Sequence, residues 1–301
     1  PRAAMRLLQT LLKHSDDLPL EGRCAPLPRA ASSWVAFVDS SHQDIDIKSK
    51  RRNDFFDFGM CDGVLGDEKI HVTVTPDNTR ALILDGASTN GFVQSKVRCQ
   101  GKSPELFSGS CDDPRIRKAW RCQEVDLTSD FAFPYVDYVM QRLKRIHCSK
   151  HMQVLMLGLG GSTMQSSLRK ACPAAELLTV EASPGVVAAA RRFFGFRGDV
   201  LVEDAREALK ELARSGRRFD AIVVDIADTV LEKEDVDHLH SLLKDSGEVL
   251  QNHTNQSKMM EQLEHFRKAF PHVDQESFQG GNILMSYRKE PKDDALRSVR
   301  S

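Results

Sequence analysis

The sequence lacks the features that mark a membrane-embedded or a nucleic-acid-binding protein. No hydrophobic run in its 301 residues approaches the roughly 20 residues that a membrane-spanning helix needs. Lys and Arg total 42 against 43 Asp and Glu, so the net charge is only −1. Such a charge gives no overall field to attract nucleic acid or anionic lipid. We therefore expect neither a membrane nor a nucleic-acid partner.

Cysteine is also scarce, and no two cysteines form a C-x-x-C pair, which argues against a zinc or redox motif. Seven scattered cysteines, an odd number, predict reduced structural thiols in an intracellular, cytoplasmic protein. We expect no metal site, because His238 and His240 lie two residues apart and do not share a helical face. The cysteines are Cys24, Cys61, Cys99, Cys111, Cys122, Cys148 and Cys172.

The first 68 residues give no functional interpretation. The chain opens PRAAMRLLQTLLKH without an initiating Met, so we expect a fragment or a processed form, and organelle targeting stays open. WVAFVDS (34–40) is compatible with a strand, and the basic run KSKRR (48–52) is best explained as a solvated loop. We treat residues 1–68 as an N-terminal extension.

A small β-rich domain with a connecting helix is predicted over residues 69–150. KIHVTVTPD (69–77) alternates apolar and polar residues, and TRALILDG (79–86) follows a turn signal, which together predict a β-hairpin. Residues 98–124 carry little periodicity and predict a long loop or an insertion. FAFPYVDYVMQRLKRIH (131–147) has apolar residues one helical turn apart and predicts an amphipathic helix.

Residues 151–290 alternate short apolar runs with helical segments, which predicts an α/β, doubly wound Rossmann-like domain. One helix is marked at both ends, because Ser183 can cap it, Pro184 suits its first position and Gly195 follows it. Residues 291–301 form a polar tail. The predicted strands are VLML (154–157), ELLTV (176–180), VLV (200–202), AIVV (221–224), EVLQN (248–252) and a closing strand in GGNILMSYRK (280–289).

A glycine loop follows the first of these strands. Gly158, Gly160 and Gly161 lie between a strand and a helix, where a backbone can approach a ligand closely. The dinucleotide fingerprint would need another glycine at Thr163, and the G-K-[ST] ending of a phosphate-binding loop is absent. The loop is therefore a poor pyrophosphate site.

Acidic residues stand at the carboxyl ends of three successive predicted strands. Glu181 is placed to accept ribose hydroxyls, Asp204 with Ala205 to receive an adenine, and Asp225 to face the same crevice. Glu181 can equally be a solvated strand end, and Asp204 can cap the next helix. Together with Gly158, Gly160 and Gly161 these residues favour a cationic adenosyl ligand, which S-adenosylmethionine is.

These stretches resemble a known family. VLMLGLGGST, LLTVEASPGVVAAARRFFGF, VLVEDAREAL and FDAIVVDIAD are similar to the spermidine-synthase-like branch of the class I methyltransferase superfamily, with coverage of about residues 69–289. The resemblance implies S-adenosylmethionine or its decarboxylated form as cofactor. It also implies a homodimer formed through the N-terminal hairpin.

Two departures from the family bear on the reaction. Aminopropyltransferases carry an acidic residue in a GGGDG loop that holds the amine of decarboxylated S-adenosylmethionine, and the matching residue here is Gly161. Phe131 and Ala132 stand where that family has carboxylates. Asp225 and Asp228, in contrast, match its D-x-x-D motif.

Three functions follow from the resemblance. The first is an S-adenosylmethionine-dependent methyltransferase acting on an amine of a protein or a small molecule, since the loop and the closing strand look closer to the methyltransferases of this branch, which include enzymes that methylate a translation elongation factor. The second is a polyamine aminopropyltransferase, and the third a catalytically silent binding module. In the enzymatic interpretations Asp225 orients the amine or accepts its proton, Asp228 assists and Tyr135 borders the pocket.

Overall fold

The structure is a computed structural model of the chain. The predicted strand at 34–40 and the candidate residue Asp228 lie outside the residues that it describes. The described residues are 23–25, 59–65, 68–74, 78–85, 92–101, 109–110, 114–115, 118, 121–126, 133–148, 151–226, 229–278 and 281–291.

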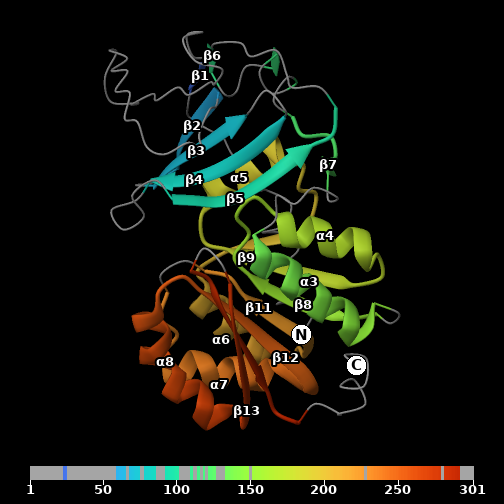
Figure 1. Cartoon of the computed structure of the whole chain (residues 1–301), viewed down its shortest axis with the longest axis vertical. Coiled ribbons are helices and arrows are strands. Elements are labelled where there is room, and N and C mark those ends of the chain that lie inside the picture. Colours follow the sequence, from blue (N-terminus) through green and yellow to red (C-terminus); the bar gives the residue numbers. More distant parts are fainter. Residues whose placement is uncertain are drawn as a thin grey trace.

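An antiparallel sheet forms one end of the molecule (Figure 1). The predicted hairpin is confirmed, because β3 pairs with β4 from Lys69 opposite Asp85 to Val74 opposite Arg80. The sheet also takes in strands from the N-terminal extension. Its strands, in the order β6-β1-β2-β3-β4-β5-β7, are β1 (Arg23–Ala25), β2 (Gly59–Leu65), β3 (Glu68–Val74), β4 (Thr79–Asp85), β5 (Phe92–Cys99), β6 (Gly109–Ser110) and β7 (Val125–Asp126).

A second, mainly parallel sheet carries the Rossmann-like domain, and this confirms the predicted fold class. Its strands, in the order β10-β9-β8-β11-β12-β14-β13, are β8 (Gln153–Leu157), β9 (Glu176–Glu181), β10 (Val200–Val202), β11 (Phe219–Val224), β12 (Leu243–His253), β13 (His272–Ser277) and β14 (Ile283–Arg288). The described helices are α3 (Pro134–His147), α4 (Thr163–Ala171), α5 (Pro184–Phe193), α6 (Ala205–Ser215), α7 (Lys233–Leu242) and α8 (Gln256–Ala269).

The last strand differs from its predicted place. β14 does not close the sheet but lies between β12 and β13, antiparallel to both. The edge belongs to β13, whose sequence HVDQES is mostly polar and exposed. A search for apolar runs misses such an edge strand, because only buried strands need continuous apolar sequence.

Helices cover both faces of the parallel sheet (Figure 1). Val154 and Met156 of β8 pack with α3 and α4, whereas Leu155 and Leu157 pack with α6, α7 and α8. This alternation is the period of two that a strand imposes on its side chains. The helix α3 buries Tyr135 and further residues of its apolar face, as its sequence spacing predicts.

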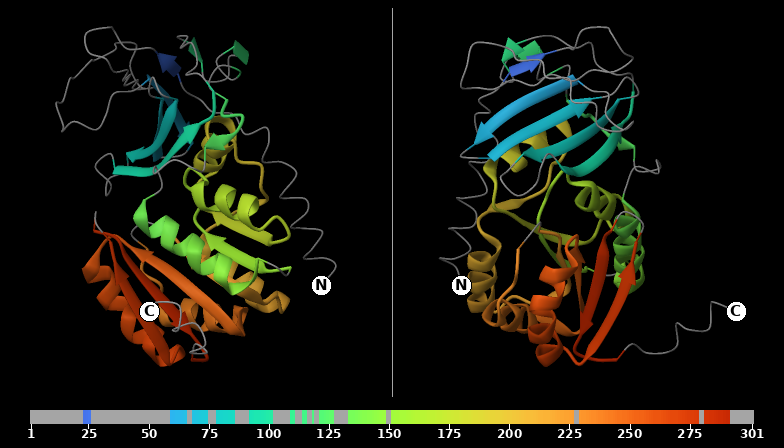
Figure 2. Two further views of the ribbon diagram at one scale, coloured as in Figure 1. Left: turned by 45° about the vertical axis from the view of Figure 1, so that its right-hand side comes forward. Right: turned by 60° about the vertical axis from the view of Figure 1, so that its left-hand side comes forward.

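Helix α5 joins the two sheets. Val187, Ala189 and Ala190 are fully buried in one cluster with Val72 and Leu82 of the antiparallel sheet. Figures 1 and 2 show α5 between this sheet and the Rossmann-like domain. A helix that is apolar on all sides is stable only where it is covered on all sides.

The signals that mark the ends of α5 are confirmed. The Ser183 side chain accepts a hydrogen bond from the Val186 N–H, and Pro184 is the first residue of the helix. Gly195 follows the helix with φ +71°, the left-handed conformation that favours glycine.

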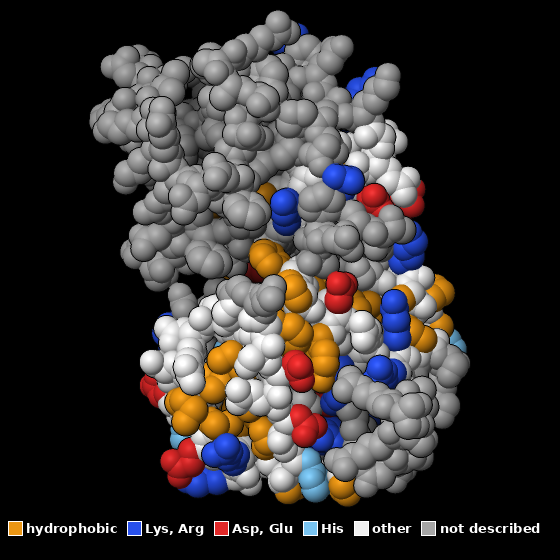
Figure 3. Space-filling view, in the orientation of Figure 1, with side chains coloured by type: hydrophobic (Ala, Val, Ile, Leu, Met, Phe, Trp, Pro, Cys, Tyr) orange, Lys and Arg blue, Asp and Glu red, His pale blue; other side chains and the backbone are white. Residues whose placement is uncertain are grey.

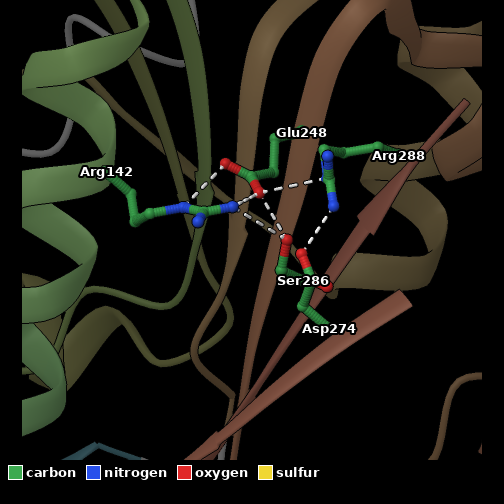
Figure 4. Close-up of polar contacts among 5 residues, drawn as sticks. All are labelled: Arg142, Glu248, Asp274, Ser286 and Arg288. Atoms are coloured by element: carbon green, nitrogen blue, oxygen red, sulfur yellow. Dashed lines mark hydrogen bonds and ion pairs between the residues drawn. The ribbon is translucent and has the colours of Figure 1, made fainter. Parts of the chain in front are cut away.

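A buried polar network fixes α3 on the sheet (Figure 4). Arg142 of α3 donates two hydrogen bonds to the Glu248 carboxylate of β12, which also accepts one from Ser286 of β14. Arg288 lies 3.7 Å from Glu248 and pairs with Asp274 of β13 at 2.5 Å. These contacts tie the helix that carries Tyr135 to three strands.

The expectation of reduced thiols is wrong for four of the cysteines. Cys99 pairs with Cys122, with Cα atoms 5.5 Å apart, and Cys148 pairs with Cys172, with Cα atoms 4.8 Å apart. Wide spacing along the sequence conceals such pairs, because the fold alone brings their Cα atoms together.

On the face seen in Figure 3, charges of both signs are interspersed with hydrophobic side chains over the lower part of the molecule.

Among the helices that the structure describes, none combines the length and the hydrophobicity that crossing a membrane requires.

Candidate functional site

Four neighbouring parallel strands bring the predicted site residues to one edge of the sheet. In the order β10, β9, β8, β11, they end at Asp204, Glu181, the glycine loop and Asp225. The main-chain ladder continues to these ends, since the Gly158 N–H donates to Val180 and the Asp225 N–H donates to Leu157. Neighbouring strands lie about 4.8 Å apart, so Glu181 and Asp225, two strands apart, are separated by about 10 Å across the edge. The four strand ends therefore lie side by side along one edge of the sheet.

The first two glycines of the loop are required by its backbone. Gly158 has φ +100° and Gly160 has φ +51°, both in the region that favours glycine. A Cβ at Gly158 would strike the backbone carbonyl of Asp225, and one at Gly160 would lie 2.5 Å from Ser95 Oγ. The loop thus packs directly on β11 and on β5 of the antiparallel sheet.

Gly161 is enclosed by side chains from two other elements. A Cβ at this position would lie 2.8 Å from Ser95 Cβ and 2.9 Å from the Phe194 ring. The Gly161 N–H donates to Ser95 Oγ at 2.8 Å. The direction in which a side chain at residue 161 would point is therefore filled by Ser95 and Phe194.

Glu181 is held by the backbone on both sides. Its Oε2 accepts the Leu159 N–H at 3.0 Å, and its Oε1 accepts the Ser183 N–H at 2.9 Å. These bonds fix the carboxylate between the glycine loop and the start of α5. Each carboxylate oxygen has two lone pairs, so Glu181 keeps acceptor capacity for hydroxyl groups of a ligand.

Asp204 caps α6, which is the second role that the sequence allows for it. Its Oδ1 accepts the Arg206 N–H at 2.9 Å, and its side chain is exposed. Ala205 is the first residue of α6. Both residues stand at the carboxyl end of β10, beside the end of β9 that carries Glu181.

Asp225 is held by side chains instead. Its Oδ2 accepts the Tyr135 hydroxyl at 3.1 Å, and its Oδ1 accepts the Asn252 side-chain amide at 2.8 Å. Asn252 is in turn held by Asn282, whose amide donates to the Asn252 oxygen at 3.1 Å. Tyr135 comes from α3, Asn252 from β12 and Asn282 from the turn before β14.

Their surroundings shift the pKa values of both Asp225 and Tyr135. Burial raises the pKa of the Asp225 carboxyl, and the hydrogen bonds from Asn252 and Tyr135 act in the opposite direction. Burial, together with the negative charge of Asp225, raises the pKa of Tyr135 well above its ordinary value. Tyr135 therefore stays a neutral donor, and Asp225 is a stronger proton acceptor than an exposed aspartate.

A small pocket lies where β5, α3 and α4 meet. It brings together the predicted residues Tyr135 and Asp225. Glu181 and Asp204 are not among the described residues that line it. The further lining residues are Gln94, Ser95, Lys96, Phe133, Val136, Leu159, Thr163, Met164 and Gln165.

Two polar residues around the site, Ser95 and Asn252, are not among the site residues that the sequence analysis proposes. Ser95 belongs to the other sheet, and its approach to the glycine loop leaves no trace in periodicity. Asn252, in contrast, ends the predicted strand EVLQN beside Asp225 and could have been found by the rule that found the carboxylates.

In the part of the chain that the structure describes, no three His, Cys, Asp or Glu residues gather closely enough to hold a metal ion.

No family model matches the chain. A polyamine aminopropyltransferase from Vibrio vulnificus is 29% identical over 137 residues, which cover 42% of this chain and 45% of that protein. The chain thus matches less than half the length of this curated relative.

Solved structures resemble a larger part of the chain. A probable spermidine synthase from Corynebacterium glutamicum has a TM-score of 0.53 at 18% identity, covering 76% of this chain and 80% of the other. Human methyltransferase-like protein 13 in complex with SAH has a TM-score of 0.48 at 19% identity, covering 53% of this chain and 81% of the other. At such identities the Corynebacterium structure shows the fold alone.

Proposed function

We propose that this chain, a spermidine-synthase-like protein of the class I methyltransferase fold, transfers the methyl group of S-adenosylmethionine to an amine on a protein or a small molecule. The observation that carries this choice is the packing around Gly161. An acidic side chain at this position would hold an aminopropyl amine, but Ser95 and Phe194 fill its place. Without that charge the lone amine cation of decarboxylated S-adenosylmethionine is costly to bury, whereas the amino-acid end of S-adenosylmethionine carries its own carboxylate, and this difference argues against aminopropyl transfer.

The distribution of charge supports a sulfonium ligand. Glu181 and Asp204 stand on the side of β9 and β10, where an adenosyl group would lie, and Asp225 stands on the side of β11. In this arrangement the acceptor nitrogen attacks the methyl carbon as the carbon–sulfur bond breaks. The sulfur keeps the electron pair of that bond and becomes a neutral thioether.

Asp225 is suited to prepare the acceptor. The amine must be neutral to attack, and it carries an extra proton after methylation. A desolvated carboxylate with a raised pKa accepts such a proton more readily than an exposed one. Tyr135 and Asn252 hold the carboxylate in place, so it can also orient the amine.

A second candidate, polyamine aminopropyl transfer from decarboxylated S-adenosylmethionine, is favoured by the Vibrio vulnificus relative. Asp225 of the D-x-x-D motif lines the pocket, and Asp228 lies outside the described residues. A third candidate is a silent binding module. It is favoured by the glycine loop, where the protein's own atoms occupy the directions of the missing side chains.

Calorimetric titration separates the three. We expect S-adenosylmethionine and S-adenosylhomocysteine to bind more tightly than decarboxylated S-adenosylmethionine. Glu181→Ala should lower the affinities for S-adenosylmethionine and S-adenosylhomocysteine by at least about tenfold, since it removes a charged hydrogen-bond acceptor. The matched control is Glu176→Ala, an exposed glutamate at the other end of the same strand, which should change nothing.

Each alternative has its own outcome. Preference for the decarboxylated form would replace methyl by aminopropyl transfer, and binding of none of the three would favour the silent module. Where S-adenosylmethionine binds, a labelled methyl group incubated with lysate identifies the acceptor class. No transfer of label to any fraction would contradict the proposed function.

A further inference from the structure

Gln165 is a buried residue of the pocket whose amide is only half used. It lies in the first turn of α4, its side chain is 1% exposed, and it lines the pocket beside Tyr135 and Asp225. Its Nε2 donates to the Gly158 carbonyl at 2.9 Å. Its Oε1 accepts no hydrogen bond from the described residues. Buried acceptors are rarely left in this state, and where they are, a ligand is one explanation.

The bond to Gly158 fixes the orientation of the amide and leaves the oxygen as the end without a partner. If the oxygen and nitrogen were exchanged, the side-chain oxygen would meet the Gly158 carbonyl oxygen, and two acceptors would oppose each other. The nitrogen is therefore on the side of the glycine loop. The oxygen is therefore the unpartnered end of the amide in this pocket-lining residue.

The position of Gln165 selects the part of the cofactor that it can meet. The carboxylates suited to adenosine, Glu181 and Asp204, stand at β9 and β10 and do not line the pocket. Gln165 lines the same pocket as Asp225, so in the proposed complex this pocket would take the part of the cofactor beyond the adenosyl group. On that side S-adenosylmethionine carries its amino-acid end, whose ammonium group offers three hydrogen-bond donors.

We propose that Gln165 Oε1 accepts a hydrogen bond from the ammonium group of the cofactor's amino-acid end and so determines affinity for that end. This inference rests on the proposed function. It assigns a recognition role to a residue of the first turn of α4, outside the glycines and the three carboxylates. Gln165 would bind the cofactor and take no part in proton transfer, because its side-chain amide does not ionise.

Two adenosine ligands test the inference. S-adenosylhomocysteine carries the ammonium group, whereas 5′-methylthioadenosine keeps the adenosine and the thioether but lacks the amino-acid end. In Gln165→Leu we expect the affinity for S-adenosylhomocysteine to fall by about tenfold to a hundredfold, the range for a lost hydrogen bond to a charged group. The affinity for 5′-methylthioadenosine should stay within about twofold, because that ligand does not use Gln165.

Control variants keep the result interpretable. Gln165→Met, measured alongside, keeps an unbranched side chain of similar length and should give the same pattern. Gln153→Leu replaces a glutamine at the start of β8, away from the pocket, and should leave both affinities unchanged. Thermal melting of each variant, together with retained 5′-methylthioadenosine binding, reports that the site is folded.

The failure of this inference differs from the failure of the proposed function. If the wild-type chain binds neither ligand, the proposed function falls and the inference falls with it. If the wild-type chain binds both and the Gln165 variants weaken both equally, Gln165 only shapes the loop and the inference is overturned. Unchanged binding of S-adenosylhomocysteine in the variants overturns it as well.

Discussion

Along the sheet edge where the parallel strands end, the carboxylates at β9 and β10 are held by different means from the carboxylate at β11. On the β9 and β10 side, Glu181 and Asp204 are bound by backbone N–H groups of Leu159, Ser183 and Arg206. On the β11 side, the carboxylate of Asp225 is bound by side chains alone in the hydrogen bonds described above, and burial raises its pKa. One side is built by the main chain and the other by side-chain contacts.

This difference indicates which side can change during evolution. Backbone donors are present whatever the side chains are, so the Glu181 side persists as long as the fold does. The donors to Asp225 come from Tyr135 and Asn252, 90 and 27 residues away, and each can be lost by one substitution. We therefore expect the β9 side to bind the adenosyl group and the β11 side to determine the reaction.

The strongest test removes the charge of Asp225. Asp225→Asn should lower methyl transfer by about 10²- to 10⁴-fold, the usual range for a general base. The affinity for 5′-methylthioadenosine should change by less than about threefold, because the backbone-held side that would bind adenosine is untouched. Initial rates and calorimetry measure the two quantities. Asp237→Asn, on the surface of α7, is the control. A parallel loss of rate and affinity would contradict the division into two sides.

The next effect concerns the buried pair that fixes α3, the helix of Tyr135. Arg142→Met leaves the Glu248 carboxylate buried with one partner fewer, so the free energy of unfolding should fall by about 3–5 kcal/mol. Urea unfolding measures this. Adding Glu248→Gln removes the buried charge and should restore part of the loss. A double variant as unstable as Arg142→Met alone would show that packing, not charge, is responsible.

A smaller loss is expected where a disulfide joins α3 to α4. Cys148→Ala should lower the free energy of unfolding by about 2–4 kcal/mol, because the unfolded chain is no longer constrained between Cys148 and Cys172. Urea unfolding of wild type and variant under oxidising conditions gives the difference, and under reducing conditions the two should agree. Alkylation of Cys172 in the wild type without prior reduction would show that the pair does not form.

The smallest effect is a shift of the pH profile. The Tyr135 hydroxyl lowers the pKa of Asp225, so Tyr135→Phe should raise that pKa further. Because the ionised carboxylate is the active form, the acidic limb of the rate profile should move to higher pH by about half to one unit, the equivalent of one hydrogen bond. Tyr138→Phe, on the same helix, is the control. A shift to lower pH would contradict the assigned hydrogen bond.

The sequence predicts the β9 and β10 side of this sheet edge better than the β11 side. Glu181 and Asp204 follow short apolar runs, and the carboxyl ends of parallel strands meet at one edge, so their proximity follows from pattern alone. Asp225 is found by the same rule, but Asn282, which holds its partner Asn252, is not, because β14 inserts between β12 and β13. The polar edge strand β13 and the two disulfides are likewise invisible to hydrophobic periodicity.

By itself the sequence determined the doubly wound sheet, the glycine loop and the order of carboxylates along its edge. These features depend on local patterns, namely apolar runs, helix caps and glycine positions, and each is complete within a few residues. Only the tertiary structure decided that Ser95 and Phe194 fill the space beside Gly161 and that Gln165, which lines the pocket, keeps a buried oxygen without a partner. Such contacts join residues far apart in the chain, and the free energy that selects them comes from packing that no single segment contains.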